Sequence, residues 1–317
     1  MAWMRWSAAR LARLVAALLI SSFVIFSAAT LAPGSPLAAL SNGRTLPPEQ
    51  QQQLRERFHL DDPFLVRYVK WLGNAVRGDF GVSVASRDEV SRLISSRMWI
   101  TAELVLYASV LILVIGIGLG LIAGLRPGAA DTSVVVVTAL LAAVPAFVAA
   151  TLLTVVFVSQ LGWFPALGEG HGFRDRVLHL TLPAVALALS SIAMVARLTR
   201  AAVREEFARE HVQTAVSRGI PRRQLVRRHV VRNAAIPITT ISGLTIASLF
   251  ALSAIVERAF SINGLGSFLV TAAGTKDIAV VQGISMVIVV AFVVINLLVD
   301  VCYLILDPRI RTAGAER

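Results

Sequence analysis

Six blocks of about 20 predominantly apolar residues, each long enough as a helix to cross a ~30 Å hydrocarbon core, run through this chain of 317 residues. Only helices and closed barrels satisfy every backbone hydrogen bond inside a bilayer. We therefore predict an all-α integral membrane protein with six transmembrane helices. The predicted spans are residues 14–31, 104–125, 134–158, 180–196, 236–256 and 279–299.

The composition agrees with a membrane protein and excludes two other classes. Hydrophobic residues make up 56% of the chain and charged residues 15%, whereas soluble domains carry about 25% charge. Disorder requires low hydrophobicity and is also excluded. The single cysteine, Cys302, excludes an intramolecular disulfide and a multi-cysteine metal site. We interpret it as a small buried apolar residue.

The distribution of arginine predicts the orientation of the chain. An even number of spans places both termini on one side of the membrane. The arginine-rich segment 197–235 lies on that same side, and positive residues favour the cytoplasm. We therefore assign residues 1–31 to a cytoplasmic N-terminus and the first helix, 32–100 to an extracytoplasmic segment and 305–317 to a cytoplasmic tail. The net charge of +11 then records orientation and lipid contact, with no nucleic-acid partner.

The first span is predicted to be retained. Arg5, Arg10 and Arg13 resemble the basic start of a signal peptide. Residues 14–31 are, however, longer than the apolar core of ~7–15 residues found in cleaved signals. The segment is therefore interpreted as a signal anchor.

The spans contain few groups that could perform chemistry or couple transport to ions. Asp300 lies near the inner end of the last span, with Glu103 and His179 at span margins. Ion-coupled carriers and pumps accept the ~2.5–3.5 kcal/mol cost of a central charge because their chemistry requires it. The sequence also has no phosphate-binding loop of the type G-x-x-x-x-G-K-[ST]. Two possibilities remain open: a passive pore, or a pore driven by separate ATPase subunits.

No catalytic, cofactor-binding or metal-ligating set is predicted in this chain. No histidine within a span can serve a serine nucleophile, and no carboxylate pair is visible. The spacing of the histidines does not form a metal site: His171, His179, His211 and His229.

The segment 197–235 is predicted to form two short helices joined at Gly219. Residues 205–219 form the first helix, with Ala208, Val212, Ala215 and Val216 on one face. Gly219 and the following Ile220-Pro221 end that helix, and Pro221 starts the second. The second helix has an apolar face of Leu225, Val226 and Val230, and a basic face of Arg222, Arg223, Arg227, Arg228 and Arg232.

Two functions fit this segment. Its arginines could bind anionic headgroups, at about 1 kcal/mol each. Alternatively, its small-residue face could dock into a groove on a cytoplasmic partner protein. Both contacts can coexist.

The external segment 32–100 has two predicted helical stretches. Pro47-Pro48 precedes the first, with Leu54 and Phe58 one turn apart, and Pro63 begins the second, with Phe64, Tyr68, Trp71 and Leu72 on related faces. So short a segment buries little core by itself and needs support from the membrane portion. It is either a cap over the outer mouth or a contact surface for a substrate-binding protein.

The fifth span carries small hydroxyl side chains at every third position, Thr239, Ser242, Thr245 and Ser248. Such residues allow close helix packing and bond back to their own helix. They could also line a translocation path. Asp300 has two interpretations as well: it is a candidate gate, or it pairs with a nearby basic group.

Short motifs along nearly the whole chain resemble one family. The segment 197–235 resembles the EAA loop of membrane subunits of ATP-binding-cassette importers, and the remainder resembles the B-type permease of the dipeptide/oligopeptide/nickel branch. The strings that carry this resemblance are Leu60-Asp61-Asp62-Pro63, Trp71-Leu72-Gly73, Arg77-Gly78-Asp79-Phe80-Gly81, Arg126-Pro127-Gly128, Leu161-Gly162-Trp163-Phe164-Pro165-Ala166, Leu182-Pro183-Ala184, Ala196-Arg197-Leu198-Thr199-Arg200, Arg228-His229, Arg232-Asn233-Ala234, Gly264-Leu265-Gly266, Val281-Gln282-Gly283 and Leu306-Asp307-Pro308-Arg309-Ile310-Arg311.

The resemblance implies which residues couple the chain to an ATPase. Gly219 is the motif glycine, and the loop includes Gln213, Thr214, Ala215, Arg218, Ile220, Pro221, His229 and Asn233. The chain departs from the general pattern in two places. Gln213-Thr214-Ala215 replace Glu-Ala-Ala, and Val231-Arg232 replace Leu-Pro.

The resemblance also implies a fold and partners. It implies the type I importer fold, with a permease domain over residues 101–304. The partners would be a homologous second permease, two ATP-binding subunits that carry ATP and magnesium, an external substrate-binding protein and the lipid of a bacterial cell membrane. The cargo would be dipeptides or other short peptides, with nickel and haem as further cargoes of the branch. The alternative is a stand-alone ion-coupled carrier or passive channel for a small solute.

Overall fold

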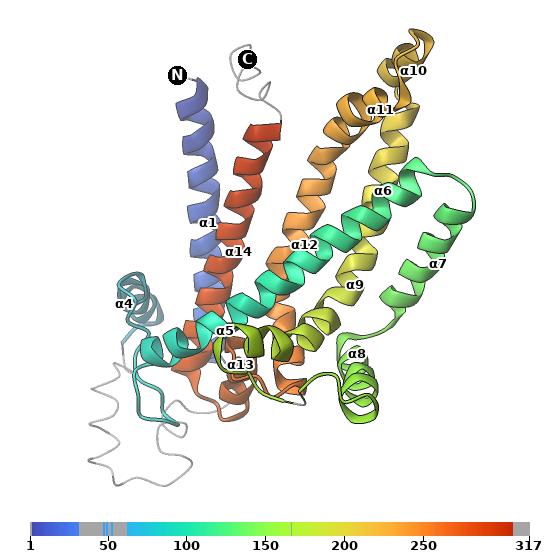
Figure 1. The fold of residues 1–317 in the computed structure, drawn as a ribbon. Coiled ribbons are helices and arrows are strands. Elements are labelled where there is room, and N and C mark those ends of the chain that lie inside the picture. Colours follow the sequence, from blue (N-terminus) through green and yellow to red (C-terminus); the bar gives the residue numbers. More distant parts are fainter. Residues whose placement is uncertain are drawn as a thin grey trace.

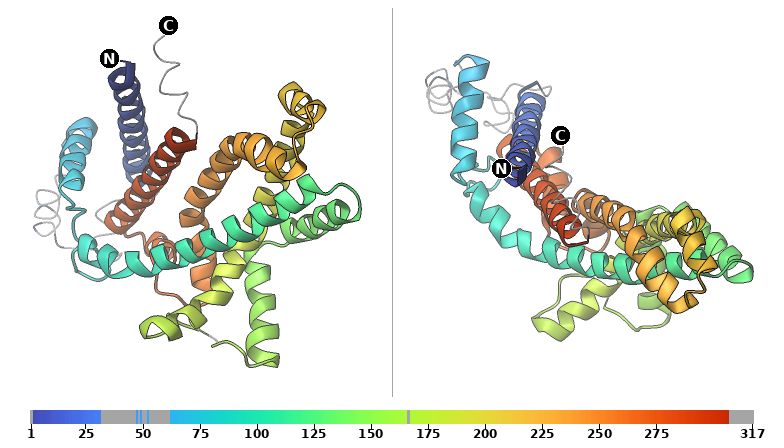
Figure 2. Two further views of the ribbon diagram at one scale, coloured as in Figure 1. Left: turned by 45° about the horizontal axis from the view of Figure 1, so that its top comes forward. Right: turned by 90° about the horizontal axis from the view of Figure 1, so that it is seen from above.

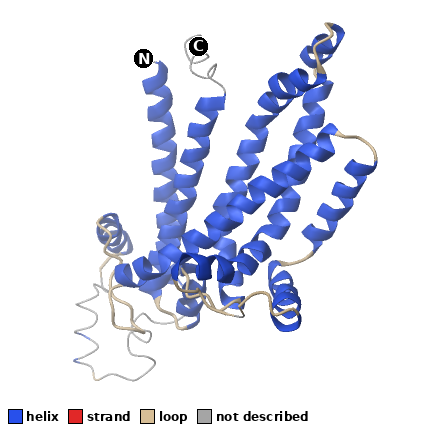
Figure 3. Ribbon diagram, in the orientation of Figure 1, coloured by secondary structure: helices blue, strands red, loops and turns tan. Residues whose placement is uncertain are grey.

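The computed structural model describes residues 2–31, 47, 49, 52, 62–165 and 167–306, with side chains described from Arg10 to Tyr303 in those ranges. All regular elements in these ranges are helices (Figure 3). The N-terminal end of α1 (Ala2–Leu31) and the C-terminal end of α14 (Ile278–Leu306) lie at the same end of the molecule as α10 (Glu210–Ser217) and α11 (Arg222–Leu225) (Figure 1). The start of the first apolar helix, the end of the last one and the 197–235 segment therefore share one end of the described molecule.

The apolar helices confirm a multi-pass membrane protein. Five helices of the described residues are long and apolar enough to cross a bilayer, and a bent pair makes six if it counts as one span. Five of the six predicted spans lie wholly inside such helices, which are Arg10–Leu31, Val90–Leu125, Gly172–Ala208, Arg222–Ala259 and Ile278–Tyr303. Pro183 and Pro237 lie inside two of these helices without ending them, as membrane helices tolerate.

The second span begins earlier than predicted. One continuous helix runs over Val90–Leu125, comprising α5 (Val90–Leu111), the π-helical segment η1 (Ile112–Gly116) and α6 (Ile117–Leu125). The predicted boundary at residue 100 therefore falls inside a helix. The polar sequence of its first turns gave no hydropathy signal. Val90 and Ile94 are buried against α13 (Leu265–Gly274) and α14, and this tertiary contact extends the helix.

The third predicted span, 134–158, is not one straight helix. It is divided into α7 (Ala129–Ala143) and a second helix of α8 (Ala146–Leu153) and the π-helical segment η2 (Thr154–Gln160), with a bend of 97° between them. Pro145 causes the break because it has no N–H to donate and pushes the preceding residue into an extended conformation. Val144 has φ −89° and ψ 115°. The apolar composition on both sides concealed this break.

The long α5–η1–α6 helix runs obliquely across the molecule and packs its far end on α9 (Gly172–Ala208) (Figure 2). Gly116, Gly120 and Gly124, one turn apart, form the contact ridge. A Cβ atom on Gly120 would lie 2.6 Å from the carbonyl oxygen of Ala196, and one on Gly124 would lie 2.7 Å from Val203. Small residues at such spacing let membrane helices approach closely.

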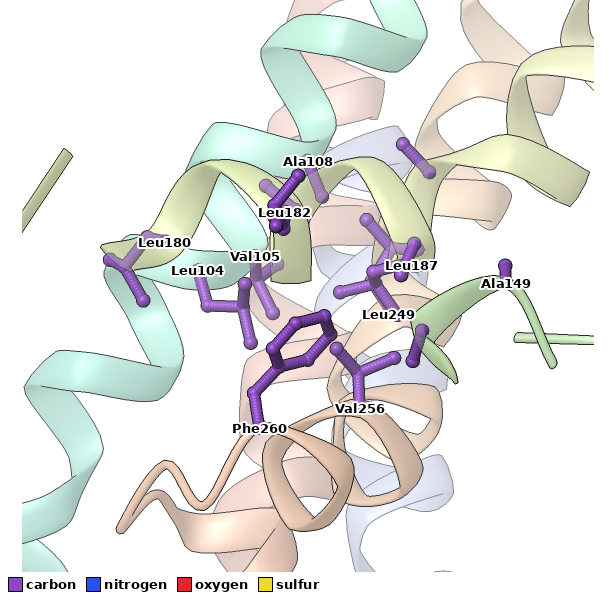
Figure 4. Packing of buried hydrophobic residues seen from close by; sticks show 14 of the residues in the cluster. Leu104, Val105, Ala108, Ala149, Leu180, Leu182, Leu187, Leu249, Val256 and Phe260 are labelled. Atoms are coloured by element: carbon purple, nitrogen blue, oxygen red, sulfur yellow. The ribbon is translucent and has the colours of Figure 1, made fainter. Parts of the chain in front are cut away.

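The main apolar core lies around the middle of this helix. Leu104, Val105 and Ala108 of α5 pack with Leu187 of α9 and with Phe260, which follows α12 (Arg232–Ala259) (Figure 4). The core therefore joins helices that are distant in the sequence.

The predicted helix after Pro63 is confirmed as α4 (Phe64–Val76). Its aromatic face packs on α1. Tyr68 lies edge-on to Phe23 at 5.3 Å between ring centroids, and Trp71 lies 5.6 Å from Phe26. The predicted stretch with Leu54 and Phe58 lies outside the described residues.

Candidate coupling loop and membrane cleft

The segment 197–235 contains one separate short helix rather than two. The membrane helix α9 continues to Ala208, and the chain turns at Arg209 (ψ 144°) before α10 begins. The second predicted helix forms the first turns of the long helix Arg222–Ala259, which comprises α11, the π-helical segment η3 (Val226–Val231) and α12. The expectation of a hairpin of two short helices is corrected, because nothing between Arg222 and the fifth span stops a helix. Helix α10 is thus joined closely to a membrane helix at each end.

Gly219 ends α10 as predicted. Its φ of +72° is a left-handed conformation that glycine adopts without a steric penalty. The Ile220 N–H donates to the Ala215 carbonyl at 3.2 Å, and the Gly219 N–H donates to the Val216 carbonyl at 2.9 Å. This pair of bonds is a Schellman motif. It fixes the direction in which the chain leaves α10.

The inner face of the loop is buried. Val212 and Ala215 of α10 pack with Leu225, Val230 and Val203 in one apolar cluster. The predicted faces around Val212, Ala215, Leu225 and Val230 are therefore confirmed. Ala208 and Val216, predicted on the same face, are exposed. The break at Arg209 leaves Ala208 in α9, outside the register of α10, and Val216 faces outward from α10.

The outer edge of the loop remains open. Gln213, Thr214, Arg218 and Pro221 are exposed, Ile220 and His229 are half-buried, and Asn233 is exposed. The Gln213 side chain donates to the Phe207 carbonyl at 2.9 Å. The basic face is also exposed, as predicted: Arg222, Arg223, Arg227, Arg228 and Arg232.

Sequence reasoning missed a buried carboxyl beneath this edge. Glu206, in the last turn of α9, is only 4% exposed. Its Oε1 accepts from Asn233 Nδ2 at 2.9 Å and lies 3.0 Å from His211 Nε2. Its Oε2 lies 3.2 Å from Arg209 Nε. Position 206 falls on the buried face of α9, whose other residues are mostly apolar. A carboxylate on such a face is the only sequence signal that could have indicated the role of Glu206.

An apolar cleft of about 630 Å³ lies between α5, α12 and α14. Two members of the predicted polar stripe line it, Thr239 and Ser242. Thr245 is buried elsewhere, and Ser248 donates to the Thr245 carbonyl at 2.7 Å. The Ser242 hydroxyl is buried without a hydrogen-bond partner among the described residues. The structure thus brings half of the stripe to one cleft.

Cys302 also lines the cleft and is exposed, so the expectation of a buried apolar residue is corrected. Asp300, two residues earlier, is buried and forms an ion pair with Arg10 of α1. This contact joins the first and last helices. A gating role for Asp300 stays a prediction.

Two further buried carboxyls lie at the opposite end of the molecule. Glu257 accepts from the hydroxyls of Thr101 at 2.7 Å and Ser253 at 3.0 Å, and from the Ser267 N–H at 2.8 Å. Asp277 accepts from the Ser83 hydroxyl at 2.6 Å. It directly precedes α14 and also accepts from the Val280 N–H in the first turn of that helix, at 3.4 Å. No local sequence signal marks either residue, because their partners are distant in the chain.

This bundle of apolar helices, with a short helical loop at one end, has a counterpart among solved structures. The solved structure of the MetNI methionine ABC transporter in inward-facing conformations includes a chain of the same fold, with a TM-score of 0.54 at 16% identity, covering 68% of this chain and 96% of that one.

Sequence comparisons identify the family. Residues 116–312 match the binding-protein-dependent transport system inner membrane component, and residues 3–105 match the N-terminal region of such components. The oligopeptide transport system permease AppB of Bacillus subtilis is 35% identical, covering 92% of this chain and 93% of AppB. A Sinorhizobium fredii protein named as a probable peptide ABC transporter permease is 32% identical, with coverage of 95% and 97%. The chain belongs to the family of inner-membrane components of binding-protein-dependent transport systems.

Proposed function

We propose that this protein is a permease subunit of an ATP-driven importer of short peptides. It would act with a homologous second permease, two ATP-binding subunits and an external substrate-binding protein, in the inner membrane of a bacterium. The names of its relatives favour peptides as cargo. The observation that carries the proposal is the construction of α10, whose inner face is buried while Gln213, Thr214 and Arg218 remain exposed.

Helix α10 is suited to transmit movement. The chain passes from α9 through a single residue, Arg209, into α10, and through Arg218–Pro221 into the long helix that ends at Ala259. Because these connections are so short, α10 can move little without moving the helices to which it is joined. If the ATP-binding subunits hold the exposed edge differently in their nucleotide-bound and nucleotide-free states, that difference in contact energy shifts the membrane helices between two arrangements.

The cleft between α5, α12 and α14 would supply part of the translocation path. A second permease subunit facing it would complete an enclosed cavity. This chain would bind no nucleotide and would hold no cofactor, because ATP and magnesium would reside on the ATP-binding subunits. Energy would therefore enter only through α10. Both chain termini would be cytoplasmic, because the start of α1 and the end of α14 lie at the α10 end.

Uptake into proteoliposomes tests the proposal. We expect the assembled complex, with its substrate-binding protein, to accumulate short peptides only when ATP is supplied. This chain alone should give no flux. Peptide accumulation by the chain alone, driven by an ion gradient or downhill without ATP, would instead establish the stand-alone carrier or channel.

The position of the path predicts which residues water reaches. In a Cys302→Ser background, we expect Thr239→Cys and Ser242→Cys to react with a membrane-impermeant maleimide several-fold faster during ATP turnover than at rest. Thr245→Cys and Ser248→Cys should stay slow, because neither lines the cleft. Labelling rates measured by mass spectrometry decide the matter. Equal inertness at all four positions would remove the cleft from the path.

A further inference from the structure

Glu206 occupies a position that is unfavourable for its own helix. It lies in the last turn of α9, where the helix dipole presents its negative end and disfavours a carboxylate. It is also 4% exposed, and a buried charge is costly unless it is paired and hydrogen-bonded. Local helix stability therefore does not explain this residue.

The partners of Glu206 explain it better, because each comes from a different part of the loop. Arg209 is the linker residue, His211 lies in the first turn of α10, and Asn233 lies in α12. Asn233 Nδ2 also lies 3.2 Å from His211 Nε2, and the ring of His229 lies 6.5 Å from that of His211. One carboxyl group thus connects the end of α9, the start of α10 and the start of the fifth membrane helix.

The neighbouring Glu205 provides a contrast. Its side chain is 73% exposed and forms an ion pair with Arg209 Nη2, at 3.2 Å, within the same segment. This pair connects no other helix. Glu205 and Glu206 therefore carry the same charge at neighbouring positions, but only Glu206 is buried and only Glu206 contacts other helices.

We propose that Glu206 is a positioning residue that fixes α10 to both adjoining membrane helices, so that force applied to α10 moves α9 and α12 together. The apolar cluster around Val212 and Ala215 holds α10 in place but permits it to slide or rotate, because apolar contacts lack direction. Hydrogen bonds to a carboxylate are directional and about twice as strong as neutral ones. Without the hydrogen bonds of Glu206, a movement of α10 would be transmitted only in part to α9 and α12. This inference rests on the proposed function and adds a residue to it.

The test uses the complete importer in proteoliposomes, with peptide uptake and phosphate release measured on the same sample. We expect Glu206→Gln to keep hydrolysing ATP while the peptide transported per ATP falls about tenfold, a change of about 1.4 kcal/mol in coupling. Glu205→Gln is the matched control and should retain the wild-type ratio. A general loss of folding would lower uptake and hydrolysis together and leave their ratio unchanged.

A second variant restores the carboxyl from the other side. In Glu206→Gln with Asn233→Asp, the carboxylate moves to α12, within reach of His211, and the amide introduced at position 206 can donate to it. We expect this exchange to recover most of the lost coupling ratio. If the Glu206→Gln protein does not assemble, the test rests on the double variant, Glu206→Gln with Asn233→Asp. That variant must assemble and must transport peptide at close to the wild-type ratio per ATP, and its failure contradicts the proposal.

A distance measurement reports the movement directly. Spin labels at Gln213→Cys and Arg227→Cys, in a Cys302→Ser background, span α10 and the fifth membrane helix. Their distance distribution should broaden in Glu206→Gln and stay narrow in Glu205→Gln.

A Glu206→Gln complex with the wild-type ratio and a narrow distribution would overturn the inference. Gly219→Val separates this outcome from failure of the proposed function, because it strains the end of α10 without changing Glu206. Uncoupling by Gly219→Val alone leaves the proposed function intact. Normal coupling in both variants would remove the loop from the mechanism.

Discussion

Gly120→Leu is expected to prevent α6 from packing on α9 and to abolish assembly of the permease. Even a single Cβ atom would lie 2.6 Å from the Ala196 carbonyl oxygen, where the obstacle is backbone and cannot rotate away. Overpacking a core costs typically ~1–3 kcal/mol when side chains can adjust, and more when they cannot. The measurement is the yield of monodisperse protein after detergent extraction and its midpoint of thermal unfolding.

Gly118→Leu is the matched control, because the same helix presents this glycine where a Cβ meets nothing within 4 Å. We expect its stability to stay within about 0.5 kcal/mol of the wild type, as for most open positions. A Gly120→Leu protein with wild-type yield and midpoint would show that α6 and α9 do not pack as described.

Glu257→Leu is expected to have the second largest effect. It leaves the Thr101 hydroxyl and the Ser267 N–H without their acceptor at a fully buried site, whereas the Ser253 hydroxyl keeps the Phe250 carbonyl as an acceptor. Each buried unsatisfied group costs ~1–3 kcal/mol, so the loss should reach several kcal/mol. The start of α13 should loosen, because Ser267 lies in its first turn. Thermal unfolding and hydrogen exchange at residues 264–270 measure both effects.

Two companion variants sharpen this prediction. Glu257→Gln keeps an oxygen for the two hydroxyls but directs its amide toward the Ser267 N–H, so we expect an intermediate loss. Arg258→Leu removes a charged side chain from the adjacent exposed position and should change little. Equal stability of Glu257→Leu and Arg258→Leu would contradict the role of Glu257 as the acceptor that holds α13.

The site was only partly predictable from the sequence. Gly219 and Pro221 indicated where α10 ends, and the spacing of the apolar residues on either side indicated the buried faces, because these signals are local. Glu206 gave no comparable signal, since Asn233 is 27 positions away. Glu257 and its partner on α5 are 156 positions apart. No local pattern specifies which distant donor reaches a carboxyl.

The sequence by itself determined that the chain spans a membrane, where five of the six predicted spans lie, and that an arginine-rich loop connects two of them. These properties depend on the length and polarity of single helices. Only the tertiary structure decided that residues 90–103 extend a membrane helix, that Cys302 faces an open cleft, and that half of the hydroxyl stripe lines it. The physical reason is that hydropathy measures the free energy of transferring a side chain from water to an apolar phase. That free energy is similar whether lipid or a neighbouring helix then surrounds the side chain. Which neighbour covers each face depends on packing between helices. The ridge of Gly116, Gly120 and Gly124, for example, sets how closely the α5–η1–α6 helix approaches α9.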